Sequence, residues 1–346
     1  MKEPFIWDRY SNQPYPIKDR AYKKSMRKKN AFSYISLLLT NLIFFPISLI
    51  VMPFFKGQKQ DAKDFFGMGV DIDKGKEQVD LVDELGVKHL LVRMPLWQMD
   101  RVDEYVEFAK SFGDDKEILI NILQDREHIE DKELLLKDID TIFAKFGSFC
   151  KEFQVGNAIN RTKWGFFSMD EYLKWFEQIQ KLRDTKYSYI KLIGSSVIDF
   201  EYYYSIRTLF NGYRIKYDKF SALLYVDRRG APQNKQYGFF DTLKKIDLLY
   251  SMVHLSPKSS NDIYITEVNW PLSGTAPYAP TSEKECVSEE EYAVFMRDYH
   301  QIALQSGKID RVYWHQLIAP GYGLVDDRDG IRKMPAFEVY RDMIKD

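Results

Sequence analysis

The sequence predicts an α/β fold, a (β/α)8 TIM barrel preceded by one N-terminal transmembrane helix. Residues 31–55 contain no charged side chain, and eight short apolar runs follow between residue 65 and the C-terminus. Amphipathic stretches of helical length separate these runs. The runs are apolar at nearly every position, as in strands of a parallel sheet buried on both faces. Eight such units suit a (β/α)8 barrel, which typically has about 250 residues.

Composition excludes several classes of protein. The 346 residues include 50 Lys and Arg against 51 Asp and Glu, so a broadly basic nucleic-acid binder is excluded and no nucleic-acid partner is expected. Cys150 and Cys286 are too few for a disulfide-rich scaffold or a cysteine zinc cluster, and their spacing demonstrates no disulfide. The five histidines lack paired metal-ligand spacing, and no dinucleotide or phosphate-binding loop is present. We therefore expect neither a metal nor a cofactor.

The N-terminal tail, residues 1–30, is strongly basic. It holds nine Lys and Arg against three Asp and Glu. This composition is typical of a disordered flanking segment. The aromatic residues Trp7, Tyr10, Tyr15 and Tyr22 indicate an alternative, which is contact with anionic lipid headgroups.

The uncharged segment, residues 31–55, is long enough to cross a bilayer, which needs about 20 apolar residues in a helix. A buried core helix is the alternative, but the length and the preceding basic cluster favour a span. A cleaved signal peptide would have a shorter leader and a small-residue exit. By the positive-inside rule, residues 1–30 lie in the cytosol and the barrel, residues 56–346, lies outside it. In a bacterium with two membranes, that compartment is the periplasm.

The barrel segment alternates strand and helix patterns. Stretches at 77–87, 170–183 and 289–307 place apolar residues at helical spacing, and Gly86 and Gly307 suit helix C-caps. A doubly wound open sheet is the structural alternative, but no G-x-G-x-x-G spacing follows the first strand. The predicted strands begin at Phe65, His89, Ile118, Phe153, Ile190, Ser221, Ile263 and Val312.

Polar and aromatic residues collect at the carboxyl ends of the predicted strands, where such barrels carry their reacting groups. Carboxylates, guanidinium groups and indoles at one rim suit a sugar, because indoles stack on its C–H faces and carboxylates and amides bind its hydroxyls. The candidates are Asp71, Asp73, Arg93, Trp97, Asn157, Asn160, Asp199, Glu201, Tyr225, Asp227, Arg228, Arg229, Glu267, Asn269, Trp270, Trp314, His315 and Gln316.

Two of these strand ends resemble a known clan of enzymes. The fourth ends in VGNAINRTKWG and the seventh in YITEVNWP, which are similar to the acid/base and nucleophile strands of clan A glycoside hydrolases, especially the family 39-like branch. The likeness covers about residues 65–346. It implies that Glu267 is the nucleophile. It further implies that Arg93 orients Glu267, Asn157 binds a sugar hydroxyl, Tyr225 or Asp227 contacts the nucleophile, and Trp270 and Trp314 contact the sugar, with Trp314 as its floor.

The resemblance has one departure. Ala158 stands where the clan has its acid/base Glu, and a methyl group cannot protonate a leaving oxygen. Retaining hydrolysis needs two carboxyl groups about 5 Å apart. One repair is that another carboxyl, from Asp199, Glu201 or Asp227, supplies the proton. A second is a diphosphate leaving group bound by the arginines at 228–229. The third possibility is that the barrel binds glycans and has lost catalytic activity.

We therefore expect a membrane-anchored glycosidase or transglycosidase that acts on envelope or cell-surface polysaccharide or glycolipid. Its expected partners are a carbohydrate or glycolipid substrate and a membrane bound through residues 31–55. A non-catalytic glycan-binding barrel, glycosyl transfer from a diphosphate donor, and an assembly partner in a glycan-synthesis complex are the alternatives.

Overall fold

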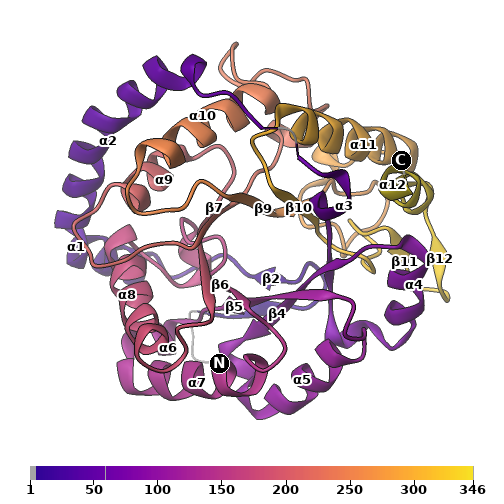
Figure 1. Cartoon of the computed structure of the whole chain (residues 1–346), viewed down its shortest axis with the longest axis horizontal. Coiled ribbons are helices and arrows are strands. Elements are labelled where there is room, and N and C mark those ends of the chain that lie inside the picture. The colour runs from indigo at the N-terminus through magenta and orange to yellow at the C-terminus, as the bar shows by residue number, and fades with distance from the viewer. Residues whose placement is uncertain (1–4, 59, 346) are drawn as a thin grey trace.

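The fold is a closed barrel of eight parallel strands, which confirms the predicted (β/α)8 architecture (Figure 1). The computed structural model describes residues 5–58 and 60–345. The strands follow one another around the barrel in chain order, and the last pairs with the first. They are β3 (Phe66–Val70), β4 (His89–Pro95), β5 (Glu117–Leu123), β6 (Glu152–Val155), β7 (Lys191–Ile198), β8 (Lys219–Leu223), β9 (Ile263–Val268) and β10 (Arg311–Trp314).

Helices surround the strands. The three helical stretches expected from apolar spacing are confirmed as α4, α8 and α11. Gly86 and Gly307 cap α4 and α11 in the left-handed conformation, with φ of 72° and 61°, which glycine adopts without a Cβ clash. The helices are α3 (Ala62–Phe65), α4 (Glu77–Leu85), α5 (Val102–Lys110), α6 (Arg126–Glu130), α7 (Lys132–Phe146), α8 (Met169–Lys186), α9 (Tyr202–Leu209), α10 (Thr242–Leu255), α11 (Glu289–Ser306) and α12 (Pro335–Lys345).

The core has an inner and an outer part. Inside the barrel, a small cluster of buried side chains comes from five strands: Leu91, Leu119, Ile193, Tyr264 and Tyr313. The larger cluster lies between the strands and the surrounding helices. With side chains packed both inside and outside the barrel, every strand is buried along nearly its whole length. The inner cluster fills the barrel interior below the strand ends, so the barrel itself leaves room for a ligand at its carboxyl rim.

The N-terminal tail folds over this rim, so the expectation of a disordered flank is wrong for its described residues. β1 (Trp7–Asp8) and β2 (Gln13–Pro14) form an antiparallel hairpin, which lies across the barrel opening in Figure 1. The Trp7 ring lies 5.0 Å from Trp97 and 5.7 Å from Trp164, measured between ring centroids. These apolar contacts partly shield Trp7 from water and hold the hairpin on the barrel.

Two helices link this hairpin to the barrel. They are α1 (Arg20–Lys29) and α2 (Ala31–Val51), which the short 3-10 helix η1 (Met52–Phe54) extends. Ala31–Phe54 is the one segment of the described chain that is long and apolar enough to cross a membrane. In the structure α2 lies on the outside of the ring, beside α9 and α10 (Figure 1).

Contacts along its length attach α2 to the barrel. The Asn41 side-chain amide donates to the backbone oxygen of Tyr203 at 2.8 Å, and the Ser251 hydroxyl donates to that of Ser48 at 2.7 Å. The tail, α2 and the barrel therefore form one body. This arrangement differs from the expected one, in which a bilayer separates residues 1–30 from the barrel, because the tail and α2 both find packing partners on the barrel.

Candidate active site

Three of the residues expected at the site surround the carboxylate of a fourth. Glu267, at the end of β9, is 8% exposed. Arg93 Nη2 donates to its Oε2 at 2.5 Å, and the Tyr225 hydroxyl donates to its Oε1 at 2.6 Å. Asn157 Nδ2 donates to Oε2 at 3.3 Å. The contacts predicted for Arg93 and Tyr225 are thus present. Asn157 also binds Glu267, while its predicted contact with a sugar hydroxyl stays a prediction.

The surroundings keep this carboxylate ionised. Burial alone would raise the pKa of Glu267, but the charge of Arg93 and the hydrogen bonds from Tyr225 and Asn157 outweigh burial and lower the pKa to about 2. Burial and the adjacent Arg93 lower the pKa of His315 to about 3, so its imidazole is neutral at pH 7. Glu267 is therefore a fixed anion at the rim of the barrel, as a carboxylate nucleophile requires.

The turn after β6 places Asn157 and removes Ala158 from the site. Gly156 has φ of 91° and Ala158 has φ of 44°, so the chain bends sharply on both sides of Asn157. Gln124, which the sequence analysis missed, holds the bend: its side-chain amide donates to the Asn157 oxygen at 2.8 Å and accepts from the Asn157 N–H at 2.9 Å. Ala158 itself is fully buried in the apolar core. Its methyl group is therefore enclosed in the core and does not face the site.

A cavity of about 200 Å³ opens beside Glu267. Asp199 is the one carboxyl other than Glu267 among its described lining residues, and Arg93, Arg161, Lys163 and Arg229 are the cations. Its other lining residues are Ser11, Asn12, Gln13, Trp164, Ile198, Tyr225, Asn269, Pro280, Thr281, His315 and Tyr322. The cavity is therefore polar, with more positive than negative side chains.

The three alternative carboxyls are placed differently. Arg161 pairs with Asp199 at 2.5 Å and with Glu201 at 2.7 Å, and Asn160 also donates to Glu201 at 2.7 Å. Asp199 lines the cavity and Glu201 does not. Asp227 begins the 3-10 helix η5 (Asp227–Arg229) and does not line the cavity, so Tyr225 and not Asp227 contacts Glu267, while a sugar contact of Asp227 stays a prediction.

The N-terminal hairpin forms one wall of the site, which the sequence analysis missed. Arg93 Nη1 donates to the Asn12 oxygen at 3.0 Å, and Lys163 Nζ donates to Gln13 Oε1 at 2.6 Å. Asn12 Nδ2 donates to Asp71 Oδ2 at 2.8 Å. The available signal was the set of aromatic residues in a basic tail, which a freely disordered segment does not need.

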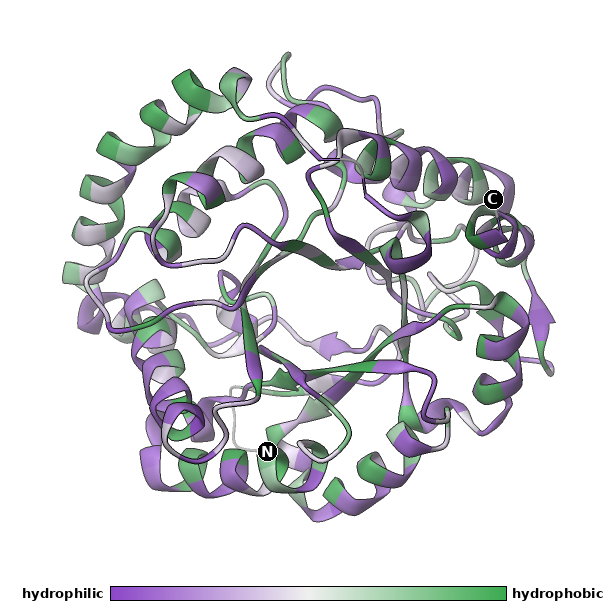
Figure 2. Ribbon diagram, viewed as in Figure 1, coloured by the Kyte–Doolittle hydropathy of each residue, from purple (hydrophilic) through white to green (hydrophobic). Residues whose placement is uncertain are grey.

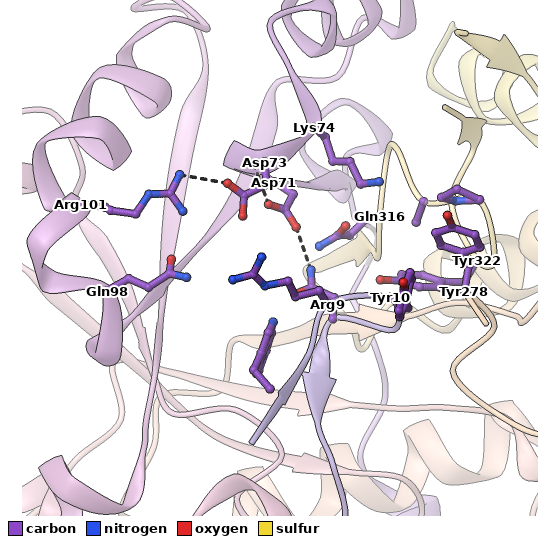
Figure 3. A pocket seen from close by; sticks show the side chains of 14 residues that line it. Arg9, Tyr10, Asp71, Asp73, Lys74, Gln98, Arg101, Tyr278, Gln316 and Tyr322 are labelled. Atoms are coloured by element: carbon purple, nitrogen blue, oxygen red, sulfur yellow. Dashed lines mark hydrogen bonds and ion pairs between the residues drawn. The ribbon is translucent and has the colours of Figure 1, made fainter. Parts of the chain in front are cut away.

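The hairpin also borders a second, larger cavity of about 420 Å³, shown in Figure 3. Arg9 points into it from the hairpin, opposite Asp73, which pairs with Arg101 at 2.9 Å. Asn12 and Tyr322 line both cavities. The two cavities are therefore adjacent.

Trp270 and Trp314 do not line the site, contrary to expectation. Both are completely buried, and they stack on each other at 5.8 Å between centroids with 16° between planes. The physical reason is strand alternation: Tyr313 points into the barrel, so Trp314 points outward and donates from Nε1 to the hydroxyl of Tyr292 on α11 at 2.7 Å. Neither indole offers a free face to a sugar.

A Trp314→Phe variant tests this assignment. The substitution removes the indole N–H and leaves the buried Tyr292 hydroxyl without that donor, so we expect the free energy of unfolding to fall by about 1–2 kcal/mol. Denaturant unfolding monitored by circular dichroism measures the change. Unchanged stability together with weaker binding of oligosaccharides would instead return Trp314 to the sugar-binding surface.

Comparisons with known proteins agree on the fold. No protein-family model matches the sequence, and no curated protein sequence matches it. Among solved structures, the chain is similar to the GH39 enzyme from Xanthomonas axonopodis pv. citri, with a TM-score of 0.54, 14% identity, and coverage of 83% of this chain and 67% of that one. It is also similar to a GH39 β-xylosidase from Caulobacter crescentus, with a TM-score of 0.55, 12% identity, and coverage of 83% of this chain and 72% of that one. A family 51 α-L-arabinofuranosidase from Bifidobacterium longum has a TM-score of 0.55 and 12% identity, with coverage of 84% of this chain and 74% of that one. The chain therefore has the barrel fold of these glycoside hydrolases.

Proposed function

We propose that the protein is a retaining glycosidase or transglycosidase with Glu267 as its nucleophile. The observation that carries this proposal is the buried, ionised Glu267 carboxylate, which Arg93, Tyr225 and Asn157 hold at the barrel rim. The structural neighbours, which include a β-xylosidase and an α-L-arabinofuranosidase, support a sugar as the substrate. We further propose that the substrate is an envelope or cell-surface glycan or glycolipid and that α2 attaches the protein to a membrane.

The chemistry assigned to Glu267 has two steps. A Glu267 oxygen bonds to the anomeric carbon while the bond to the leaving oxygen breaks, and a water or a second sugar hydroxyl then displaces Glu267. Tyr225 and Arg93 leave the carboxylate in one orientation, so little reorganisation precedes the attack. The leaving oxygen requires a proton unless it is already a stable anion.

We propose that Asp199 supplies this proton. Among the three carboxyls considered, it alone lines the cavity beside Glu267. Asp199 directly follows β7, and β7 pairs with β6. Its carboxyl therefore lies one strand away from the end of β6, where clan A glycoside hydrolases carry their acid/base residue. Its partner Arg161 holds the side chain at the cavity wall, and the carboxyl takes up from solvent the proton that it delivers once the bound sugar displaces Arg161.

An Asp199→Asn variant tests the role of this carboxyl. Glycosides with poor leaving groups should lose about 10²–10⁴-fold in kcat/KM, because their departure needs a general acid. Aryl glycosides with activated leaving groups should change little in the first step, and azide should restore the second. Glu201→Gln is the matched control, since Glu201 shares Arg161 but lies outside the cavity. Equal losses for both kinds of substrate would contradict the proposal.

A second candidate activity is glycosyl transfer from a donor with a diphosphate leaving group. The observation that favours it is the cationic lining: Arg229 Nη1 is buried with no hydrogen-bond partner among the described residues, and Lys163 lines the same cavity. Arginine and lysine bind phosphate oxygens strongly. Turnover of a sugar diphosphate that depends on Glu267 and Arg229, but not on Asp199, would select this activity. Oligosaccharide binding without any turnover would select the non-catalytic glycan-binding barrel.

A further inference from the structure

Helix α2 has the opposite polarity to an ordinary outer helix of a soluble barrel. Every exposed position from residue 31 to residue 54 is apolar. Phe32 is 83% exposed, Leu42 is 65% exposed and Ile50 is 69% exposed. Figure 2 shows the same contrast, since α2 is largely hydrophobic while the neighbouring α8 has many hydrophilic positions. The remaining large apolar side chains on this outer face are Ile35, Leu38, Leu39, Ile43, Ile47 and Phe54.

The polar side chains of α2 are on its other face, toward the barrel. Ser33 and Ser48 are buried, and Asn41 donates to the Tyr203 oxygen on α9. The Tyr34 hydroxyl donates to the Phe167 oxygen at 2.7 Å. An ordinary surface helix turns its apolar stripe inward and its polar stripe outward. α2 therefore turns its polar side chains toward the barrel, together with apolar side chains such as Phe44, which stacks on Phe210, and presents an apolar surface to its surroundings.

The barrel surface that flanks α2 does not suit the interior of a bilayer. Helices α8 and α10 contact α2 from either side. Arg207 and Lys258 of the barrel line a cavity together with side chains of α2, including Leu39 and Phe44. If α2 crossed a membrane in this arrangement, these two basic side chains would lie in hydrocarbon, which charged groups strongly disfavour.

Charge beside the apolar face identifies the partner. Helix α1, which directly precedes α2, exposes Lys24, Arg27, Lys28 and Lys29. None of these four pairs with an acidic side chain in the described part of the chain. Free basic side chains next to an apolar helix face are the combination that binds an anionic lipid surface.

We propose that α2 lies in the plane of an anionic lipid bilayer, with its outer face in the acyl boundary and α1 among the headgroups, and that the chain does not cross the membrane. The hairpin, α1 and the barrel then stay on one side, as their mutual contacts require. The rim that carries Glu267 lies at the α1 end of α2, where Asn30 accepts from the Ser168 hydroxyl that caps α8. The inference is independent of the glycosyl chemistry.

Vesicle flotation of the full chain tests the lipid surface. We expect binding to vesicles that contain phosphatidylglycerol and little binding to vesicles of phosphatidylcholine alone. Leu42→Glu should weaken binding by about tenfold or more, and so should Arg27→Glu combined with Lys28→Glu. The matched control is Val294→Glu, which changes an exposed apolar side chain on α11 and should bind normally.

Tags at the two ends of the full chain test the orientation. In closed membrane vesicles, added protease should remove both tags or neither, because an in-plane helix leaves both ends on one side. Removal of one tag alone would show a transmembrane helix and overturn the proposal. Failure to bind any vesicle, with self-association that Leu42→Glu abolishes, would make a second copy of the chain the partner of this face and would equally overturn it.

Discussion

A Glu267→Gln variant is expected to lose turnover of activated aryl glycosides by about 10³-fold or more, which corresponds to about 4 kcal/mol of activation free energy. The amide keeps the size of the side chain but cannot form the glycosyl bond. Initial rates with nitrophenyl xylosides, arabinofuranosides and galacturonides measure the effect. Azide should not rescue this variant, because the first step is the one that is lost.

The control for this variant is Glu152→Gln. Glu152 begins β6 at the opposite end of the barrel, where it pairs with Lys219 at 2.6 Å. It carries the same chemical change without touching the rim, so its activity should match the unchanged protein. If Glu267→Gln kept the parent rate on every substrate with measurable turnover, Glu267 would not be the nucleophile.

An Arg93→Met variant should be both less stable and shifted in its pH dependence. Arg93 is the charged partner of a buried carboxylate, so its removal at pH 7 should lower the free energy of unfolding by about 3–5 kcal/mol. With Arg93 present, the pKa of Glu267 is about 2, below its ordinary 4.5, so this group stabilises the fold above pH 4.5 and the stabilisation is lost between pH 4.5 and 2.

Without Arg93, burial dominates and the pKa of Glu267 rises. A group whose folded pKa is raised costs stability when it is ionised, so the deficit of Arg93→Met should shrink as the pH falls. The acidic limb of the pH–rate profile should move to higher pH, because Glu267 must be ionised to act as the nucleophile. Thermal unfolding and kcat/KM measured across pH values test both effects.

Arg183→Met is the matched control for the loss of a buried arginine, since Arg183 and Arg93 are both 8% exposed. Arg183 on α8 pairs with Asp218 at 2.7 Å and lies away from the rim. It should lower stability without moving the acidic limb. If Arg93→Met left that limb in place, the Arg93 contact would be structural only.

Several features of the site were predictable because parallel strands end at one rim. Glu267, Arg93 and Asn157 come from segments far apart in the sequence, and strand order alone brings them near each other. The choice between Tyr225 and Asp227 was not predictable. It depends on where β8 ends and on the turn of η5, which removes Asp227 from the cavity.

The tryptophans show the same limit. The sequence places Trp270 and Trp314 at strand ends, but an apolar run buried on both faces has no polar alternation to reveal which side chains point inward. The structure shows both indoles packed against each other beneath α11. Only the orientation of each strand in the closed barrel decides which residues face the ligand.

The sequence by itself determined the eight strand and helix units, the long apolar helix and the carboxylate at the end of β9, because each depends on local pattern and chain order. The tertiary structure alone decided that residues 5–19 cover the rim and that α2 turns its polar side toward the barrel. It also decided that Asp199 shares the cavity with Glu267. These features depend on contacts between segments far apart in the chain, and such contacts leave no periodic signal in the sequence.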